Sequence, residues 1–291
     1  MIPFRKILFP VDYSQPCHQV VPYVKDMAER FSAEIIVLRA FELPPVGMGD
    51  LGYESAATAP MISPVDFESI EEGRLAKFLR TDFAGMDVRT KFVVGDAAHA
   101  IGAAAKEEIV DLIMMPTRGQ GAFRRLLLGS VTGKVLHDAD CAVWTDTHEA
   151  LETHKPTIPY KSVVCALGLN DESRAILHGA AAIAKAYGAS LHIVHSVETP
   201  PTSYEVDFGP FRKELIETAD SEIKKLRAEA QVDATISIGS GAVAEVVRAE
   251  SERHKADLVV TGRGLAQTRV SRVWSALYGI VRESPCPVLS I

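Results

Sequence analysis

Apolar residues in this chain form short continuous runs, which alternate with stretches where they recur every three or four positions. The short runs are typical of strands buried on both faces of a sheet, and the wider spacing is typical of helices. In the first half, the runs predict strands at residues 6–11, 33–41, 88–94, 111–115 and 141–145. The wider spacing predicts helices at residues 14–31, 67–83, 97–108 and from about 130. This alternation predicts a parallel sheet wound with right-handed crossovers.

The same pattern begins again after a polar segment that contains Pro156 and Pro159. In the second half, the runs predict strands at residues 161–167, 190–197, 232–238 and 257–261 and after Cys286. The halves also match in sequence, because VDLIMMPTRG resembles ADLVVTGRG, and Gly119 precedes Cys141 by as many positions as Gly264 precedes Cys286. An internal duplication therefore predicts two domains, residues 1–147 and 160–291, joined by a linker at 148–159.

The stretch RGQGAFRRLLLGSV, residues 118–131, lies between a predicted strand and a predicted helix. Its glycines let backbone N–H groups approach a ligand closely, and the N-terminus of the following helix attracts negative charge. Three arginines, Arg118, Arg124 and Arg125, accompany the glycines, and Ser130 adds a hydroxyl. The arrangement predicts a phosphate site. In the alternative interpretation, the glycines form only a turn, Ser130 is only a helix cap, and the arginines form a solvated face.

Composition and charge narrow the classes of function. The formal net charge of −7 argues against a general nucleic-acid surface, which needs clustered basic residues. No run of eighteen apolar residues occurs and the N-terminus does not resemble a signal peptide, so we expect no membrane span and a cytoplasmic location. The four cysteines form no CxxC pair and the histidines are scattered over several predicted elements, so neither a disulfide framework nor a metal site is predicted.

Each half resembles the universal stress protein family, and the whole chain resembles its tandem two-domain form. The resemblance rests on a first strand ending in VD, the DLIMM strand and loop, a nine-residue spacer before GSV, and a last strand opening near a cysteine. It implies two α/β domains, each a doubly wound five-stranded parallel sheet of the Rossmann-like, adenine nucleotide alpha hydrolase-like kind. It also implies ATP as ligand, with Mg²⁺ accompanying the phosphates.

Mapped onto the first half, the resemblance places phosphates at Gly119, Gly129, Ser130 and Val131. It places Asp12 near the adenine or the ribose, although Asp12 is equally well explained as a helix-entry residue beside the candidate cap Ser14. The complete set of expected nucleotide-binding residues is Pro10, Val11, Asp12, Ala40, Met115, Pro116, Arg118, Gly119, Arg124, Gly129, Ser130, Val131 and Thr132. Pro116 departs from the family pattern, because it stands where a glycine is expected and has no N–H to donate.

The second half departs further from the family pattern. Leu167 aligns with Asp12, Gly262 and Gly264 are separated by one residue instead of two, and Trp274 replaces the glycine before Ser275. Leucine cannot accept a hydrogen bond from a nucleotide, and an indole fills space where a phosphate loop needs a close approach. We therefore expect no ATP site of the family type in the second half.

The main functional hypothesis is a nucleotide-sensing regulatory protein of the stress response that binds ATP in its first domain. The family resemblance implies that the last strands of the two halves pair about a pseudo-twofold axis, and it leaves a homodimer and an unidentified protein partner open. The first alternative is an interaction protein that binds no nucleotide. The second is a slow ATPase, although no general base can be identified near the loop. A long loop at residues 42–66 is a candidate lid.

Overall fold

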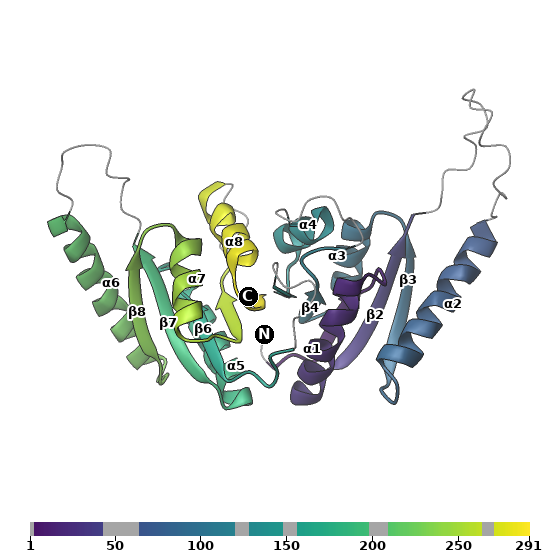
Figure 1. Cartoon of the computed structure of the whole chain (residues 1–291), viewed down its shortest axis with the longest axis horizontal. Coiled ribbons are helices and arrows are strands. Elements are labelled where there is room, and N and C mark those ends of the chain that lie inside the picture. Colours follow the sequence, from purple (N-terminus) through teal and green to yellow (C-terminus); the bar gives the residue numbers. More distant parts are fainter. Residues whose placement is uncertain (1–2, 43–63, 120–127, 148–155, 198–208, 264–270) are drawn as a thin grey trace, which may run out of the picture.

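The computed structural model describes residues 3–42, 64–119, 128–147, 156–197, 209–263 and 271–291 (Figure 1). Its strands are β1 (Lys6–Pro10), β2 (Glu34–Phe41), β3 (Val88–Val94), β4 (Leu112–Met115), β5 (Ala142–Thr145), β6 (Ser162–Ala166), β7 (Ser190–Val197), β8 (Thr235–Ser240), β9 (Leu258–Thr261) and β10 (Val288–Ser290). Its helices are α1 (Gln15–Phe31), α2 (Pro64–Asp82), α3 (Ala97–Glu107), α4 (Ser130–Asp138), α5 (Ser173–Tyr187), α6 (Gly209–Glu229), α7 (Val243–Arg253) and α8 (Ser271–Glu283).

The strands form one ten-stranded sheet in the order β3-β2-β1-β4-β5-β10-β9-β6-β7-β8. Within each half every neighbouring pair is parallel, as the alternation of apolar runs and helices predicts. The halves meet where β5 and β10 pair antiparallel, with Leu289 opposite Trp144. The predicted fold class is therefore confirmed, and the predicted pairing of the two last strands is present.

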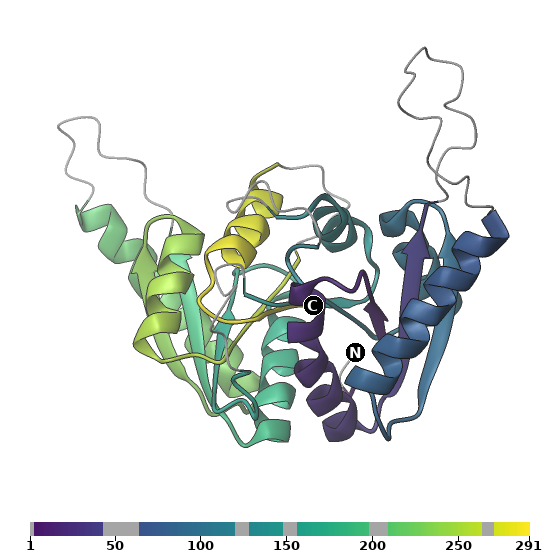
Figure 2. The same ribbon diagram turned by 45° about the vertical axis from the view of Figure 1, so that its right-hand side comes forward.

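Helices cover both faces of this sheet, because successive strand residues point to opposite sides. On β1, Ile7 and Phe9 belong to one buried cluster and Leu8 belongs to the other. The first cluster includes residues of α1, α2, α5 and α6, and the second includes residues of α3, α4, α7 and α8. On the face of the second cluster, α4 and α8 lie next to each other at the junction of the halves, as Figures 1 and 2 both show.

A cluster of aromatic side chains seals the junction on the other face of the sheet. The ring centroids of Tyr23 and Trp144 in the first half are 4.9 Å apart, and those of Tyr160 and Tyr187 beyond the linker are 4.7 Å apart. The indole Nε1 of Trp144 donates a hydrogen bond of 3.1 Å to the hydroxyl of Tyr160. The guanidinium of Arg30 lies 4.5 Å from the centre of the Tyr187 ring. Apolar burial, hydrogen bonding and cation–π contact therefore hold the halves together.

Most predicted boundaries agree with the structure within one or two residues, and two differ by three residues. The strand predicted at 232–238 is observed as β8, which begins at Thr235, because Gln231 adopts a positive φ of 52° and the Val232 N–H bonds back to the Arg227 carbonyl at 3.1 Å. These residues end α6 instead of opening the strand. Helix α2 begins at Pro64, earlier than predicted, and residues 43–63 of the candidate lid lie outside the described residues.

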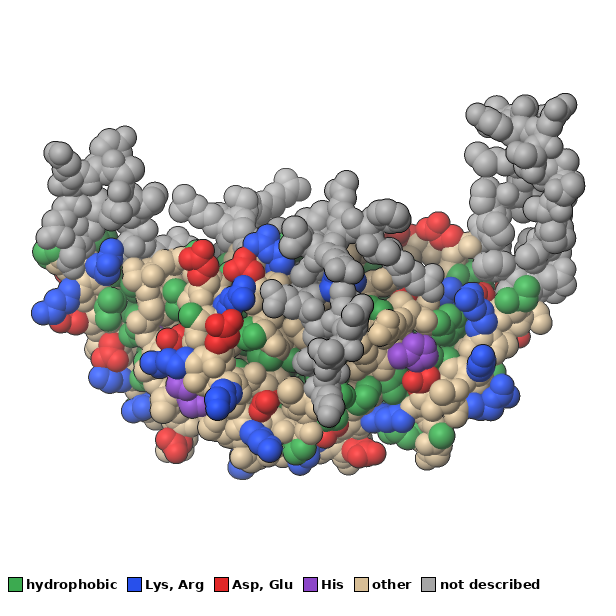
Figure 3. Space-filling model, viewed as in Figure 1, with side chains coloured by type: hydrophobic (Ala, Val, Ile, Leu, Met, Phe, Trp, Pro, Cys, Tyr) green, Lys and Arg blue, Asp and Glu red, His purple; other side chains and the backbone are tan. Residues whose placement is uncertain are grey.

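On the face in Figure 3, basic and acidic side chains are interspersed, and no single-sign patch of the kind that binds a nucleic-acid backbone is visible. Among the described helices, none is both long enough and apolar enough to cross a membrane.

Asp146 is a buried acidic group at the junction of the two halves. It directly follows β5, is 4% exposed, and its Oδ1 accepts a hydrogen bond of 2.7 Å from the Thr147 N–H. The Thr147 hydroxyl in turn donates to the carbonyl of Ser284 in the second half at 3.4 Å. Burial raises the pKa of Asp146 to about 7, and the Thr147 amide offsets only part of that rise.

Because the folded pKa of Asp146 lies above its ordinary value of 3.8, its contribution to stability is full below pH 3.8 and is lost as pH rises through 7. Asp146→Asn, which stays neutral, is expected to match the wild type near pH 4 and to exceed its free energy of unfolding by a few kcal/mol at pH 8, at about 1.4 kcal/mol per pKa unit. Urea unfolding across this pH range measures the difference. The control is Asp140→Asn, whose side chain is 75% exposed and which is expected to show no such divergence. Parallel pH profiles for Asp146→Asn and the wild type would contradict the prediction.

Candidate functional site

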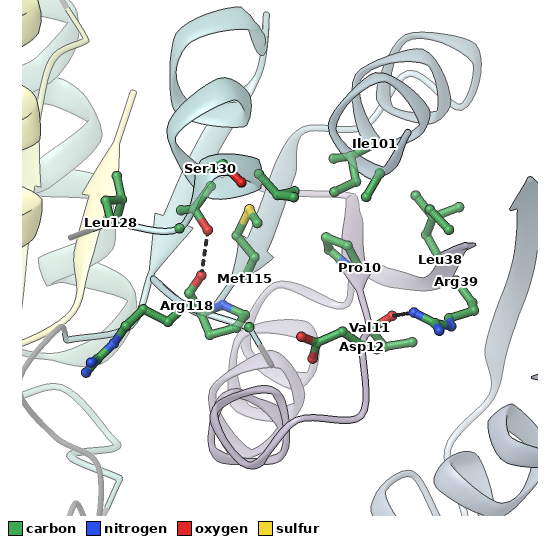
Figure 4. A pocket seen from close by; sticks show the side chains of 17 residues that line it. Pro10, Val11, Asp12, Leu38, Arg39, Ile101, Met115, Arg118, Leu128 and Ser130 are labelled. Carbon is green, nitrogen blue, oxygen red and sulfur yellow. Dashed lines mark hydrogen bonds between the residues drawn. The ribbon is translucent and has the colours of Figure 1, made fainter. Parts of the chain in front are cut away.

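A cavity of about 590 Å³ opens at the carboxyl ends of β1, β2 and β4, next to α3 and the start of α4 (Figure 4). Open α/β sheets bind ligands at this edge, and the volume is within the usual range of ligand pockets, about 300–1,000 Å³. The residues predicted from sequence that line it are Pro10, Val11, Asp12, Ala40, Met115, Pro116, Arg118, Gly119, Gly129, Ser130, Val131 and Thr132. Arg124, the remaining predicted residue, lies outside the described residues, as does Arg125.

Five lining residues were not predicted from the sequence: Leu38, Arg39, Ala97, Ile101 and Leu128. Leu38, Ile101 and Leu128 are buried and belong to the same apolar cluster as Met115. In Figure 4, Leu38 and Ile101 lie on one side of Met115, and Leu128 lies on the other, next to the start of α4. Leu38 and Arg39 directly precede the predicted residue Ala40, so their position near the end of the predicted strand could have identified them as lining residues. Ala97 and Ile101 lie one turn apart on α3, and only the packing of that helix brings them to the cavity.

The N-terminus of α4 forms the polar end of the cavity. Gly129 is the N-cap, and its carbonyl accepts the first intrahelical hydrogen bond, 2.8 Å from the Gly133 nitrogen. Among the described residues no side chain caps this helix, so the amides of Ser130, Val131 and Thr132 are available to a ligand or to water. Ser130 is the first helical residue, so its interpretation as a helix cap was wrong. An uncapped, positively polarised helix end suits a phosphate.

Hydrogen bonds position the start of α4 against the end of β4. The Thr132 hydroxyl donates to the Pro116 carbonyl at 3.0 Å, and the Gly129 N–H donates to the Thr117 carbonyl at 2.9 Å. Pro116 provides no N–H of its own, yet its carbonyl helps to place the amides of α4. The departure at Pro116 therefore removes one donor and leaves the helix N-terminus in position.

Asp12 has two roles at the opposite side of the cavity. Its Oδ1 accepts hydrogen bonds from the backbone N–H of Ser14 at 3.0 Å and from the Ser14 hydroxyl at 2.6 Å. The Ser14 oxygen caps α1 by accepting the Cys17 N–H at 3.3 Å. A Cβ added to Gly119 would lie 2.4 Å from Asp12 Oδ2, so the absence of a side chain at Gly119 gives this carboxylate its place. Asp12 thus supports the helix entry and also faces the cavity.

The two described arginines of the cavity are placed differently. Arg118 extends away from Asp12, as Figure 4 shows. Arg39 is held in the wall, because its Nε donates to Glu71 Oε2 at 2.6 Å and its Nη1 donates to the Val11 carbonyl at 3.4 Å. The expected contact of Arg118 with phosphate stays a prediction, and Arg39 contributes a fixed positive charge that the sequence did not reveal.

Glu71 anchors Arg39 from the cavity's outer side. Its side chain is 1% exposed and also bonds the Nη1 of Arg74 at 2.8 Å. Burial acts to raise the pKa of Glu71, but the hydrogen bonds from Arg39 and Arg74 outweigh it and lower the pKa below 4.5. Both guanidinium groups lie over the ring of Tyr13, at 4.9 and 5.5 Å from its centre. The Arg39 side chain is therefore fixed on several sides before any ligand arrives.

Comparison with known proteins shows which family this fold belongs to. The model of the universal stress protein family matches residues 3–145 and 159–291, which is most of the chain. The chain belongs to the universal stress protein family. A universal stress protein of Methanocaldococcus jannaschii is 26% identical over 140 residues, covering 48% of this chain and 80% of the relative. One of Thermus aquaticus is 32% identical over 140 residues, covering 48% of this chain and 96% of the relative.

Solved structures support the tandem fold. The crystal structure of a universal stress protein from Archaeoglobus fulgidus covers 98% of this chain and 97% of its own, with 24% identity and a TM-score of 0.66. That likeness shows the fold alone. The crystal structure of a universal stress protein in complex with cAMP covers 49% of this chain at 20% identity and a TM-score of 0.35, too low a likeness to support an argument about this chain.

The second universal stress protein domain corrects one sequence alignment. Val11 N–H bonds the Leu38 carbonyl, and Leu167 N–H bonds the Val194 carbonyl in the same position of the fold. Leu167 is therefore the counterpart of Val11, and Gly168 is the counterpart of Asp12. The alignment failed because the short apolar strands permit a one-residue slip that only the hydrogen-bond register resolves. The consequence is unchanged, since glycine provides no carboxylate either.

The second domain also lacks a helix end at the phosphate position. Helix α8 begins at Ser271, so Trp274 lies within its first turn and Ser275 is its fifth residue. Only the first four amides of a helix lack an intrahelical acceptor, so the Ser275 amide is used inside the helix. The segment that leaves amides available in the first domain is thus absorbed into α8.

Glu71→Gln is expected to lower the free energy of unfolding by about 3 kcal/mol at pH 7, because it removes the charge that compensates two guanidinium groups at a buried position. This stabilisation is present above pH 4.5 and is lost as pH falls through the lower folded pKa, so the difference from the wild type shrinks in acid. Urea unfolding at pH 7 and pH 4 measures both effects.

The matched control for this prediction is Glu34→Gln. Glu34 pairs with Arg89 at 2.7 Å, but the Arg89 side chain is 52% exposed and that of Glu34 is 36% exposed, so we expect a loss below about 1 kcal/mol. Equal losses for the two variants would show that the buried cluster is no stronger than a surface pair.

Proposed function

We propose that the first domain binds an adenine nucleotide, ATP accompanied by Mg²⁺, and that the chain acts as a cytoplasmic, nucleotide-sensing regulator of the stress response. The observation that carries the proposal is the 590 Å³ cavity, which combines buried apolar side chains with the uncapped N-terminus of α4. A base packs well against Leu38, Ile101 and Met115, while phosphates are attracted to amides and a positive helix end.

The residues present also suit the metal as a companion of the phosphates. Mg²⁺ is usually held by one or two carboxylates together with substrate phosphates. Asp12 is the carboxylate among the described lining residues, and the described part of the chain contains no group of three or more His, Cys, Asp or Glu able to hold a metal ion. In this proposal the nucleotide therefore brings most of the metal's ligands.

Isothermal titration of the intact chain with Mg·ATP tests the proposal, with one bound nucleotide per chain as the expected stoichiometry. Gly129→Asp is expected to weaken binding at least tenfold. Its carboxylate would cap the α4 amides and repel phosphates, while aspartate is a favourable N-cap that keeps the fold. A Cβ at Gly129 would lie 3.2 Å from the Thr117 carbonyl oxygen, a tight contact.

The matched control is Gly73→Asp on α2, which adds the same charge at an exposed position with nothing within 4 Å of the new Cβ. We expect its affinity to stay within twofold of the wild type. Absence of ATP binding by the wild type would favour an interaction protein that binds no nucleotide, and unchanged binding by Gly129→Asp would contradict a nucleotide site at the N-terminus of α4. Phosphate release during the titration would favour a slow ATPase, and two nucleotides per chain would contradict the loss of the second site.

A further inference from the structure

The second domain has a cavity of its own at the carboxyl ends of β6, β7 and β9, with a volume of about 240 Å³. Its floor is apolar and buried, formed by Ile176, Val194, Val247, Leu277 and Ile280. The side of α8 lines this cavity, instead of a helix N-terminus as in the first domain. A Cβ on Gly262 would lie 2.3 Å from Ile176 Cδ1, so this isoleucine occupies the space beside the loop.

Three side chains that line this cavity present hydrogen-bond acceptors, while the amide nitrogen of Asn170 is a donor. Glu172 Oε2 is buried and has no hydrogen-bond partner among the described residues. The Nδ1 of His195 lies 2.8 Å from the Leu167 carbonyl and must donate to it, so in the neutral ring Nε2 is an acceptor. The Ser196 hydroxyl donates to the Gly241 carbonyl at 2.8 Å, which leaves its oxygen as a further acceptor. A ligand that donates hydrogen bonds would satisfy these groups.

The charge on the described lining residues disfavours a phosphate and favours a cation. Glu172 is the charged side chain among the described lining residues. Arg263 is near enough for the charge of Glu172 to act on its pKa, which burial lowers overall. The Arg263 guanidinium donates to the Ala139 carbonyl in the first domain, and no ion pair joins Arg263 to Glu172. A buried carboxylate oxygen without a partner is costly, and a bound ammonium group would remove that cost.

We propose that the second domain binds a small organic amine, whose ammonium group pairs with Glu172 and whose apolar body packs on Ile176, Val247 and Leu277. The cavity has about the volume of eight water molecules at about 30 Å³ each, which suits a single ring or a short chain. The duplicated fold thus provides two sites of different chemistry, one for an anion and one for a cation. This inference does not depend on ATP binding by the first domain.

Benzylamine is a suitable probe, with benzyl alcohol and benzoate as neutral and anionic counterparts of similar shape. In the full-length chain with labelled isoleucine methyl groups, benzylamine is expected to shift the Ile176 signal with a Kd of about 1 mM or tighter. Glu172→Gln should weaken this binding at least tenfold. Ala276→Trp, at a half-buried lining position on α8, should block it by filling the cavity.

The control Glu252→Gln removes the same charge from an exposed position on α7 and should leave the benzylamine affinity within twofold. The Gly129→Asp chain should bind benzylamine as the wild type does, which separates this test from that of the nucleotide site. The proposal is overturned if no probe shifts Ile176, if benzyl alcohol or benzoate binds as tightly as benzylamine, or if Glu172→Gln binds benzylamine unchanged.

Discussion

The antiparallel pairing of β5 with β10 is the interaction on which the architecture depends. Each half alone would expose a short, strongly apolar last strand at the edge of its sheet, with unpaired backbone groups. Pairing satisfies both edges and creates one ten-stranded sheet. It also places α4 and α8 side by side, where the Arg263 guanidinium of the second domain reaches the carbonyl of Ala139, the residue that ends α4. The helix that offers its N-terminus to a ligand is thus held at its other end by the second domain.

The two domains differ mainly in where one helix begins. In the first, α4 begins at Ser130 after a glycine N-cap, so its first amides point to a cavity. In the second, α8 begins at Ser271 and takes the corresponding amides into its own hydrogen bonds. A shift of about one turn therefore exchanges an anion-attracting helix end for an apolar helix side, while the sheet beneath is unchanged. Duplicated sheets can diverge in ligand chemistry in this way without any loss of core packing.

The sequence predicted the fold well, because continuous apolar runs and helical spacing are local signals that agree with each other along the chain. It also predicted that the end of β1, the end of β4 and the glycines of the loop line the cavity. This prediction follows from the rule that ligands bind at the carboxyl ends of parallel strands. Arg39 was missed because its importance comes from Glu71, a residue of another element that only tertiary packing brings near. Leu167 was misaligned because apolar strands carry no internal mark of their register.

The distribution of buried charge underlies the different ligands that we propose for the two cavities. In the first domain, the carboxylate of Glu71 is compensated by two guanidinium groups, so the cavity wall keeps a positive group, Arg39, and the helix end adds partial positive charge. In the second, Arg263 is directed to the junction and Glu172 has an oxygen without a partner among the described residues. A ligand charge of the opposite sign would be costly in either cavity, because burial would leave that charge neither solvated nor paired. Because the arginines of the two domains have different partners, packing outside each cavity would set the sign of the charge that it accepts under these proposals.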